Sequence, residues 1–105
     1  MLNSAILVND DFIVCSHSKN IYEGDLSLEC NAIMMLFVKM KKTEMQGGTL
    51  YADGCVGLNE AAMIVAAKIS KVVLTCMPVM SDEMCAVEIL KENNISVIYN
   101  SDNIL

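Results

Sequence analysis

The amino-acid sequence predicts a single α/β domain, with a five-stranded mixed sheet and helices on its faces. Five short runs rich in apolar and β-branched residues are spaced along the chain, and segments with helical character separate the later runs. The length of 105 residues is that of one domain. Hydrophobic residues make up 54% of the chain, which supplies ample material for a core.

The first two strands are expected to form a hairpin. Residues 4–9 and 12–17 are short β-branched runs, and the Asn9-Asp10-Asp11 stretch between them indicates a tight turn. A polar stretch, Ser18 to Asp25, follows the second strand.

A helix is expected next. Leu28, Ala32, Met35 or Leu36, and Met40 recur at spacings of three and four, which is the helical period. The pair Gly47-Gly48 ends this unit.

The second half alternates strands with helices. Residues 49–53 are a strand candidate, and the helix expected from Asn59 to Lys68 is apolar on nearly every face. Such a helix is covered on both sides, so we expect the sheet on one side and a subunit or another helix on the other. Residues 72–76 indicate a buried strand.

The last helix and strand complete the sheet. Ser81 is expected to cap a helix from Asp82 to about Asn93, with Asp82 and Glu83 in its first turn, where the dipole favours acidic residues. Residues 95–99 form the last strand. One helix lies between the third and fourth expected strands and another between the fourth and fifth. These strands should therefore be parallel and joined by crossover connections.

Charge and composition exclude several classes of function. Seven basic residues against thirteen acidic ones give a net charge of −6, which argues against a broad nucleic-acid surface. The one dense basic cluster, Lys39, Lys41 and Lys42, is typical of the C-terminal turn of a helix. No apolar run reaches the roughly 18 residues of a membrane span, and residues 1–4 lack a basic secretory start. We therefore expect a cytoplasmic protein, whose five cysteines, without a C-x-x-C pair, act as small hydrophobes.

Two sequence words carry a resemblance. Residues 27–33 read S-L-E-C-N-A-I, and residues 49–53, after Gly47-Gly48, read T-L-Y-A-D. In this order they resemble the H-A-E-x-N-A-I and T-L-Y-V-T words of the cytidine deaminase superfamily, above all of its deoxycytidylate and tRNA adenosine deaminase branches. The family's P-C-x-x-C word then falls on residues 56–60. The resemblance implies a three-layer α/β/α sandwich with strand order 2-1-3-4-5 and helices on both faces. It also implies a homo-oligomer through the apolar helix Asn59 to Lys68, because members commonly associate through these helices.

The resemblance also assigns the positions of a metal site. In the family, one His and two Cys bind zinc, and a glutamate shuttles protons. The His position is Ser27 here, the Cys positions are Gly57 and Glu60, and Glu29 occupies the proton-shuttle position. Gly57 has no ligating atom, and one carboxylate does not make a site that needs three protein ligands. We therefore expect no metal, no cofactor and no zinc-dependent deamination.

Alternatives remain open for several residues. Cys30 and Cys55 lie next to the motif positions and could form a relocated metal site, and a shifted alignment would use Cys76 and Cys85 instead. Glu29 either stabilises a helix N-terminus or keeps a part in ligand binding.

Two further residues belong to the candidate pocket. His17, the only histidine, is expected to end the second strand, with Asn20 close by. By resemblance these positions approach the sugar of a nucleotide, while a solvated loop histidine is the structural alternative.

Three functions follow from these assignments. The first is a non-catalytic deaminase-like protein that binds a pyrimidine nucleotide or a protein partner, and a small, acidic, Met-rich chain would suit a viral or mobile-element protein. The candidate pocket residues are Ser27, Glu29, Gly57, Glu60, His17 and Asn20. The second is an active deaminase-type hydrolase with an atypical site, and the third is a structural subunit of a deaminase complex.

Overall fold

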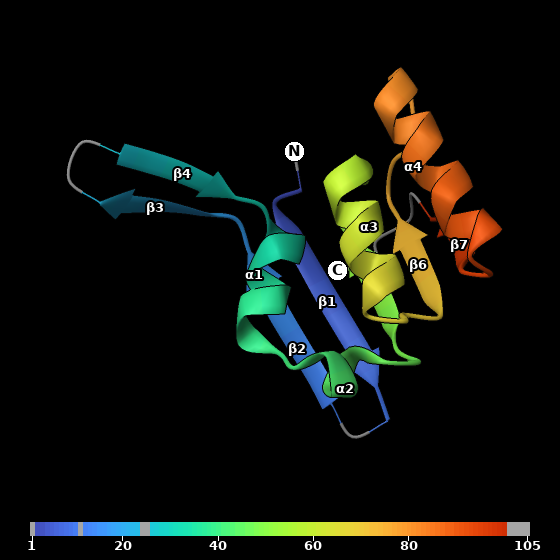
Figure 1. The fold of residues 1–105 in the computed structure, drawn as a ribbon, viewed down its shortest axis with the longest axis horizontal. Coiled ribbons are helices and arrows are strands. Elements are labelled where there is room, and N and C mark those ends of the chain that lie inside the picture. Colours follow the sequence, from blue (N-terminus) through green and yellow to red (C-terminus); the bar gives the residue numbers. More distant parts are fainter. Residues whose placement is uncertain (1, 11, 24–25, 101–105) are drawn as a thin grey trace.

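A five-stranded sheet and four helices make up most of the computed structural model, which describes residues 2–10, 12–23 and 26–100. In chain order the elements are β1 (Ser4–Asn9), β2 (Phe12–His17), β3 (Lys19–Glu23), β4 (Leu26–Cys30), α1 (Ala32–Lys39), α2 (Lys42–Met45), β5 (Thr49–Ala52), α3 (Leu58–Ala66), β6 (Lys71–Leu74), α4 (Ser81–Glu92) and β7 (Ser96–Tyr99). The main sheet has the order β2-β1-β5-β6-β7 (Figure 1). Counted along the main sheet alone, this is the predicted order 2-1-3-4-5.

The predicted N-terminal hairpin is confirmed. Strands β1 and β2 pair antiparallel from Ser4↔His17 to Asn9↔Phe12. Asp10 in the turn has φ +34°, in the left-handed region that Asp tolerates better than most residues. The side-chain amide of Asn9 donates to the carbonyl oxygens of Glu44 (2.8 Å) and Gln46 (3.0 Å), which ties the turn to the region of α2.

The second half of the sheet is parallel, as predicted. Strand β5 pairs antiparallel with β1 but parallel with β6, and β6 is parallel with β7. Helices α3 and α4 form the two crossovers, and α3 lies within the predicted range Asn59 to Lys68 except for its first residue. The predicted cap of α4 is wrong: Met80, not Ser81, is the N-cap residue, and Ser81 is already helical.

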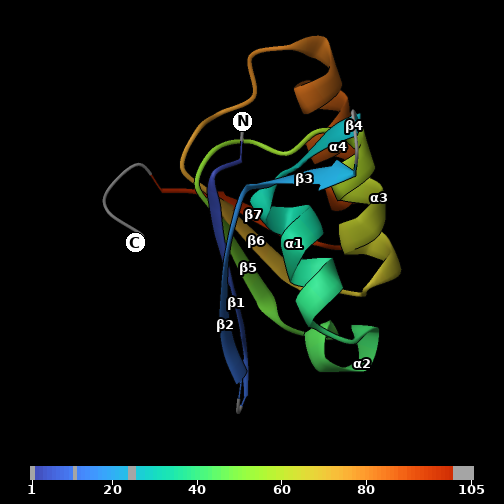
Figure 2. The same ribbon diagram turned by 90° about the vertical axis from the view of Figure 1, so that its left-hand side faces the viewer.

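The described helices lie against one face of the sheet (Figure 2). Alternate residues of the strands, including Ala5, Leu7, Leu50 and Leu74, are fully buried beneath them. The expected helical layer on the opposite face is not formed by the described residues. The physical reason lies in the crossovers, because two successive right-handed connections that advance in one direction along a sheet place both helices on the same side.

The opposite face of the sheet is consequently more exposed. Ile13 on β2 is 74% exposed and Ile98 on β7 is 40% exposed. Ile6, Val8 and Tyr51 on the central strands β1 and β5 keep partial exposure.

The segment before α1 differs from the prediction. Residues 19–23 and 26–30 pair as a second hairpin, β3–β4, which projects from the domain (Figure 1). The helix expected to include Leu28 begins only at Ala32. Asn31 is its N-cap, and the Asn31 side-chain oxygen accepts the N–H of Met34 at 2.9 Å. Leu28 pairs with Ile21 across the hairpin, so strand pairing replaces the first helical turn.

The lysine cluster also spans two elements instead of one. Lys39 lies in the last turn of α1, as predicted, and its ammonium donates to the Cys15 carbonyl oxygen at 3.1 Å. Lys41 is the N-cap residue of α2 and Lys42 its first residue, so both positions begin a new helix and the prediction is wrong for them.

Glycines make the close connection from α2 to β5. Gly47 has φ +77°, which L-residues rarely adopt. A Cβ atom at Gly48 would lie 3.0 Å from the carbonyl oxygen of Met45 and 3.1 Å from that of Val8. The predicted end of this unit at Gly47-Gly48 is therefore confirmed.

Among the described residues, no helix is long and apolar enough to cross a bilayer.

Candidate functional site

The start of α3 carries two of the predicted site residues. Gly57 is the N-cap residue, with φ −97°, and Glu60 is the third helical residue. One carboxylate oxygen of Glu60, Oε1, accepts the backbone N–H of Gly57 at 3.2 Å. A Cβ atom at Gly57 would lie 3.1 Å from that oxygen. Glu60 therefore caps the first turn of α3 by accepting the N–H of Gly57, a residue that has no side chain.

The same device recurs at two other helices. At α2, Glu44 Oε1 accepts the N–H of Lys41 at 2.8 Å. At α4, Glu83 Oε1 accepts the N–H groups of Val79 and Met80, both at 3.1 Å. The N–H of Met80 contributes most to lowering the pKa of Glu83, and the N–H of Val79 lowers it further. Three helices of this chain therefore begin with a glutamate, three residues after the N-cap, that accepts backbone N–H groups. The geometry at Glu60 is that of such a cap.

The other motif residues lie on the projecting hairpin. Ser27 and Glu29 are on β4, and Asn20 on β3 is the register partner of Glu29. The hairpin extends away from α3 (Figure 1). The structure therefore does not bring Ser27 and Glu29 together with Gly57 and Glu60. Glu29 lies two residues before Asn31, the N-cap of α1, so it precedes the helix and is not part of its first turn.

His17 ends β2, as expected. Its Nδ1 lies 3.2 Å from the hydroxyl oxygen of Ser4, its partner across the antiparallel pair. Neighbouring residues Ser16 and Ala5 are buried on the helical face. Because side chains alternate along a strand, His17 belongs to the opposite face, away from α3.

A polar network that the sequence analysis missed lies at the carboxyl ends of β5 and β6. The Thr75 hydroxyl accepts the N–H of Gly54 at 2.7 Å and donates to Asp53 Oδ1 at 3.3 Å. Thr75 follows β6 directly, and Asp53 follows β5. Polar residues directly after parallel strands are the signal that could have indicated this edge.

Two titratable groups beside this edge have raised pKa values, which favour their neutral forms. Burial raises the pKa of the Cys55 thiol, and the Glu83 carboxylate adds to the rise. Burial also raises the pKa of Tyr99, with contributions from Cys55 and Glu88. A protonated thiol is a poor metal ligand and a poor nucleophile, so Cys55 fits the role of a packed, half-buried side chain.

The described residues at the positions assigned to zinc ligands do not fit a zinc site. In the part of the chain that the structure describes, no group of three or more His, Cys, Asp or Glu side chains is arranged to hold a metal ion. Cys30 is buried, whereas Cys76 and Cys85, the cysteines of the shifted alignment, are exposed in the loop after β6 and on α4. Gly57 offers no donor atom, and Glu60 is engaged by a backbone N–H.

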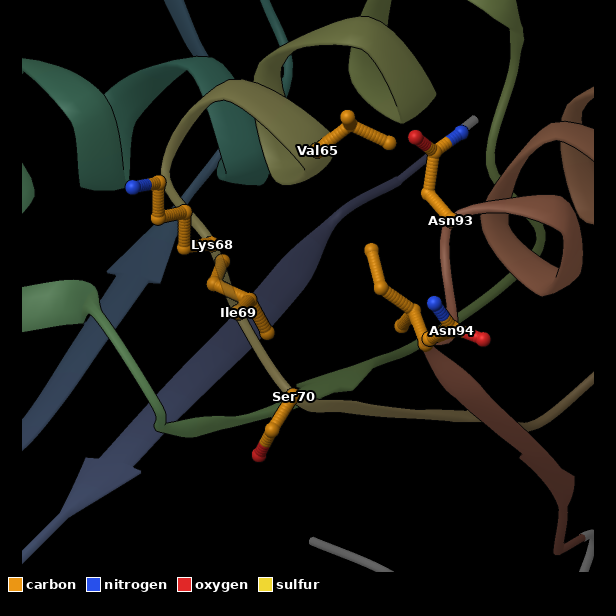
Figure 3. Close-up of a pocket in the computed structure, with 7 residues that line it drawn as sticks. Val65, Lys68, Ile69, Ser70, Asn93 and Asn94 are labelled. Atoms are coloured by element: carbon orange, nitrogen blue, oxygen red, sulfur yellow. The ribbon is translucent and has the colours of Figure 1, made fainter.

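A hollow at the amino ends of the parallel strands is formed by the turns that follow two helices. It has a volume of about 360 Å³ and lies between the turns that follow α3 and α4 (Figure 3). Lys68 (φ +58°) and Asn94 (φ +62°) occupy the left-handed positions of these turns. Their side chains and that of Asn93 are exposed. Open α/β sheets bind ligands at the carboxyl ends of their strands, so this hollow at the amino ends is not the candidate site. Its lining comprises Val65, Lys68, Ile69, Ser70, Asn93, Asn94 and Ile95.

The comparison with solved structures identifies the fold. The dCMP deaminase of the cyanophage S-TIM5, in complex with dCMP and dUMP, superposes with a TM-score of 0.75 at 17% identity, over 92% of this chain and 79% of that one. RibD of Acinetobacter baumannii gives a TM-score of 0.67 at 22% identity, over 91% of this chain and 27% of that one. The fold is that of the cytidine and deoxycytidylate deaminases.

The deaminase fold extends to a third structure, a bifunctional protein. The diaminohydroxyphosphoribosylaminopyrimidine deaminase/5-amino-6-(5-phosphoribosylamino)uracil reductase of Thermotoga maritima gives a TM-score of 0.62 at 21% identity, over 91% of this chain and 28% of that one. No protein-family model matches the chain, and no curated protein matches its sequence.

Proposed function

We propose that this deaminase-fold chain acts by binding a pyrimidine nucleotide or a protein partner, and that it does not carry out zinc-dependent deamination. The observation that supports this proposal is the start of α3, where the two cysteine positions of the resemblance are Gly57 and Glu60. One has no side chain, and the other accepts a backbone N–H at 3.2 Å. The third ligand position, Ser27, lies on another element, β4.

The energetic consequence of this replacement is large. Zinc lowers the pKa of bound water from about 15.7 to about 7. Without zinc, ionising the attacking water costs on the order of 10 kcal/mol more free energy, at about 1.4 kcal/mol per pKa unit. General base catalysis by a carboxylate contributes only about 10²–10⁴ in rate. Glu29 alone would not restore the reaction.

The carboxyl edge of β5 and β6 is the favoured place for a nucleotide. Open α/β sheets bind ligands at this edge. Here Asp53 and Thr75 supply a carboxylate and a hydroxyl, which are held together with Gly54 by hydrogen bonds. The cyanophage dCMP deaminase with the same fold was solved with dCMP and dUMP. A pyrimidine nucleotide is therefore the ligand class to test first.

A protein partner is proposed on α3. Ala61 and Ile64 are buried on the inner side, while Ala62 and Ala66 on the outer side are exposed. Small side chains allow close approach of a second helix, so a homo-oligomer through Asn59 to Lys68 remains our proposal. Replacing both exposed alanines with glutamate would reduce the mass measured by light scattering if α3 forms that contact.

Nucleotide titration followed by NMR tests the proposal. We expect dCMP or dUMP to shift amide resonances of residues 53–60 and 75–76 saturably, with no release of ammonia from dCMP. Thr75→Val should weaken this binding, whereas Thr43→Val on exposed α2 should not. Ammonia release that a chelator abolishes would refute the non-catalytic proposal. A protein that binds no nucleotide, forms no oligomer and captures no partner would leave it without support.

A further inference from the structure

An exposed apolar patch surrounds the start of α4. Its four side chains all belong to an eight-residue stretch: Met77 (65% exposed), Val79 (79%), Met80 (69%) and Met84 (51%). Single exposed apolar residues are ordinary on protein surfaces. Four exposed apolar side chains within one short stretch at the start of α4, at the edge of the fold (Figure 1), are typical of an interaction surface.

The patch continues into a groove on the outer side of α4. The inner side of this helix packs into the core through Ala86, Val87 and Leu90. This groove is a shallow, open hollow of about 400 Å³ on the surface of α4 itself, and it is lined by Met84, Cys85, Glu88, Ile89 and Glu92. Met80, Met84 and Glu88 are spaced by four residues, so they form one ridge along the helix. An apolar end therefore passes into an acidic end on one surface.

The charges around the groove have one dominant sign. Asp82, Glu88 and Glu92 are exposed, against the single cation Lys91 on this helix. Within the described residues, none of the three carboxylates forms an ion pair or a hydrogen bond. Glu83 is already engaged by the N–H groups at the start of the helix. The groove therefore offers uncompensated negative charge beside an apolar surface.

This charge decides between the two obvious occupants. A second copy would add its own Asp82, Glu88 and Glu92 to the same interface, and an excess of like charge across an interface is unfavourable. A cationic partner would neutralise them and would be attracted by the whole chain, whose net charge is −6.

We propose that the outer face of α4, together with residues 77–80, binds a basic amphipathic helix of a partner protein. Its apolar side chains would lie on Met80 and Met84, and its Lys or Arg side chains would face Glu88 and Glu92. Methionine side chains are flexible and polarisable and adapt to varied apolar partners. Apolar anchors spaced by three and four residues are the usual pattern of a helix held in a groove.

This inference is separate from the nucleotide binding and from the α3 contact proposed above, because its surface lies on α4 and residues 77–80. An active deaminase could carry the same surface on α4, and a chain that binds nucleotide could lack a partner there. The assays for zinc and for nucleotide therefore fail or succeed separately from the test that follows.

The test uses a fluorescent synthetic helix of about 18 residues, with Leu at positions i, i+3, i+4 and i+7 and Lys elsewhere. We expect saturable binding that weakens as salt rises. Met80→Ser combined with Met84→Ser should weaken binding about tenfold. Glu88→Gln combined with Glu92→Gln should weaken it about fivefold at low salt.

A control matched in charge separates the groove from the overall field. Glu88→Gln with Glu92→Gln changes the net charge from −6 to −4, and so does Thr43→Lys with Ser96→Lys on other exposed elements. The control pair should leave binding within about twofold of the parent protein. Equal loss in both pairs would overturn the proposal, as would equal binding of a Leu/Glu helix. A dimer that Met80→Ser with Met84→Ser dissociates would show that a second copy occupies the face.

Discussion

Substitution of Glu60 distinguishes a helix cap from a metal ligand. The Glu60 carboxylate accepts one backbone N–H, that of Gly57, at 3.2 Å in the half-buried first turn of α3. Losing such a cap costs about 1 kcal/mol, so Glu60→Ala should lower the free energy of unfolding by about that amount. For a domain of roughly this size, 1 kcal/mol corresponds to a fall in Tm of about 4–8 °C.

The glutamine variant makes the test specific. Glu60→Gln keeps an acceptor oxygen and loses only the favourable charge at the helix N-terminus, so it should cost about 0.5 kcal/mol. Glu88→Ala on the exposed face of α4 is the matched control and should stay within about 0.5 kcal/mol of the parent protein. Urea unfolding followed by circular dichroism measures all three, with and without a chelator. A chelator that destabilises the parent protein, together with a Glu60→Gln variant as unstable as Glu60→Ala, would contradict the role of Glu60 as a helix cap.

Three further predictions concern single positions. Ser16 is fully buried, and its hydroxyl has no hydrogen-bond partner among the described residues, so Ser16→Ala should raise the free energy of unfolding by about 1 kcal/mol in urea titrations; a clear loss would show that the hydroxyl is satisfied. Gly48→Ala should cost about 1–3 kcal/mol by the same measurement, because the new methyl group would press on two carbonyl oxygens at 3.0 and 3.1 Å. Burial raises the pKa of Cys55, so at pH 8 iodoacetamide should alkylate it more slowly than the exposed Cys85, as read by mass spectrometry. Because the pKa of Cys55 is higher in the folded protein than in the unfolded chain, its contribution to stability is fully present below the pKa of the unfolded thiol. This contribution should be lost as pH rises through the raised pKa in the parent protein, but not in Cys55→Ala. Equal alkylation rates of Cys55 and Cys85 would contradict both statements.

The strands were predictable because their signals are local. β-branched runs flanked by turn residues gave the β1–β2 hairpin, and apolar runs separated by helical segments gave the three parallel strands. Strand order followed from the resemblance and from the rules of crossover connections. The acidic first turn of α4 was predicted, but the caps were not: Ser81 was expected where Met80 is the N-cap, and Glu60 was interpreted as a former zinc-ligand position.

The hairpin β3–β4 was not predictable from periodicity. Residues 28–40 satisfy a helical period, yet the pairing of Leu28 with Ile21 converts the first part into a strand. Such pairing depends on a second segment, so a pattern within one window does not contain it. The candidate pocket residues are divided between two elements for the same reason, because Ser27 and Glu29 lie on that strand. The placement of α3 and α4 on one face, by contrast, follows from the predicted strand order and the right-handed crossover rule, which the expectation of helices on both faces did not apply.

Metal analysis of the purified protein tests whether the chain holds a zinc ion. We expect a substoichiometric zinc content by mass spectrometry after purification without chelator, and no ammonia from dCMP when zinc is added. A content of about one zinc per chain, held through dialysis and lost together with deaminase activity, would contradict it.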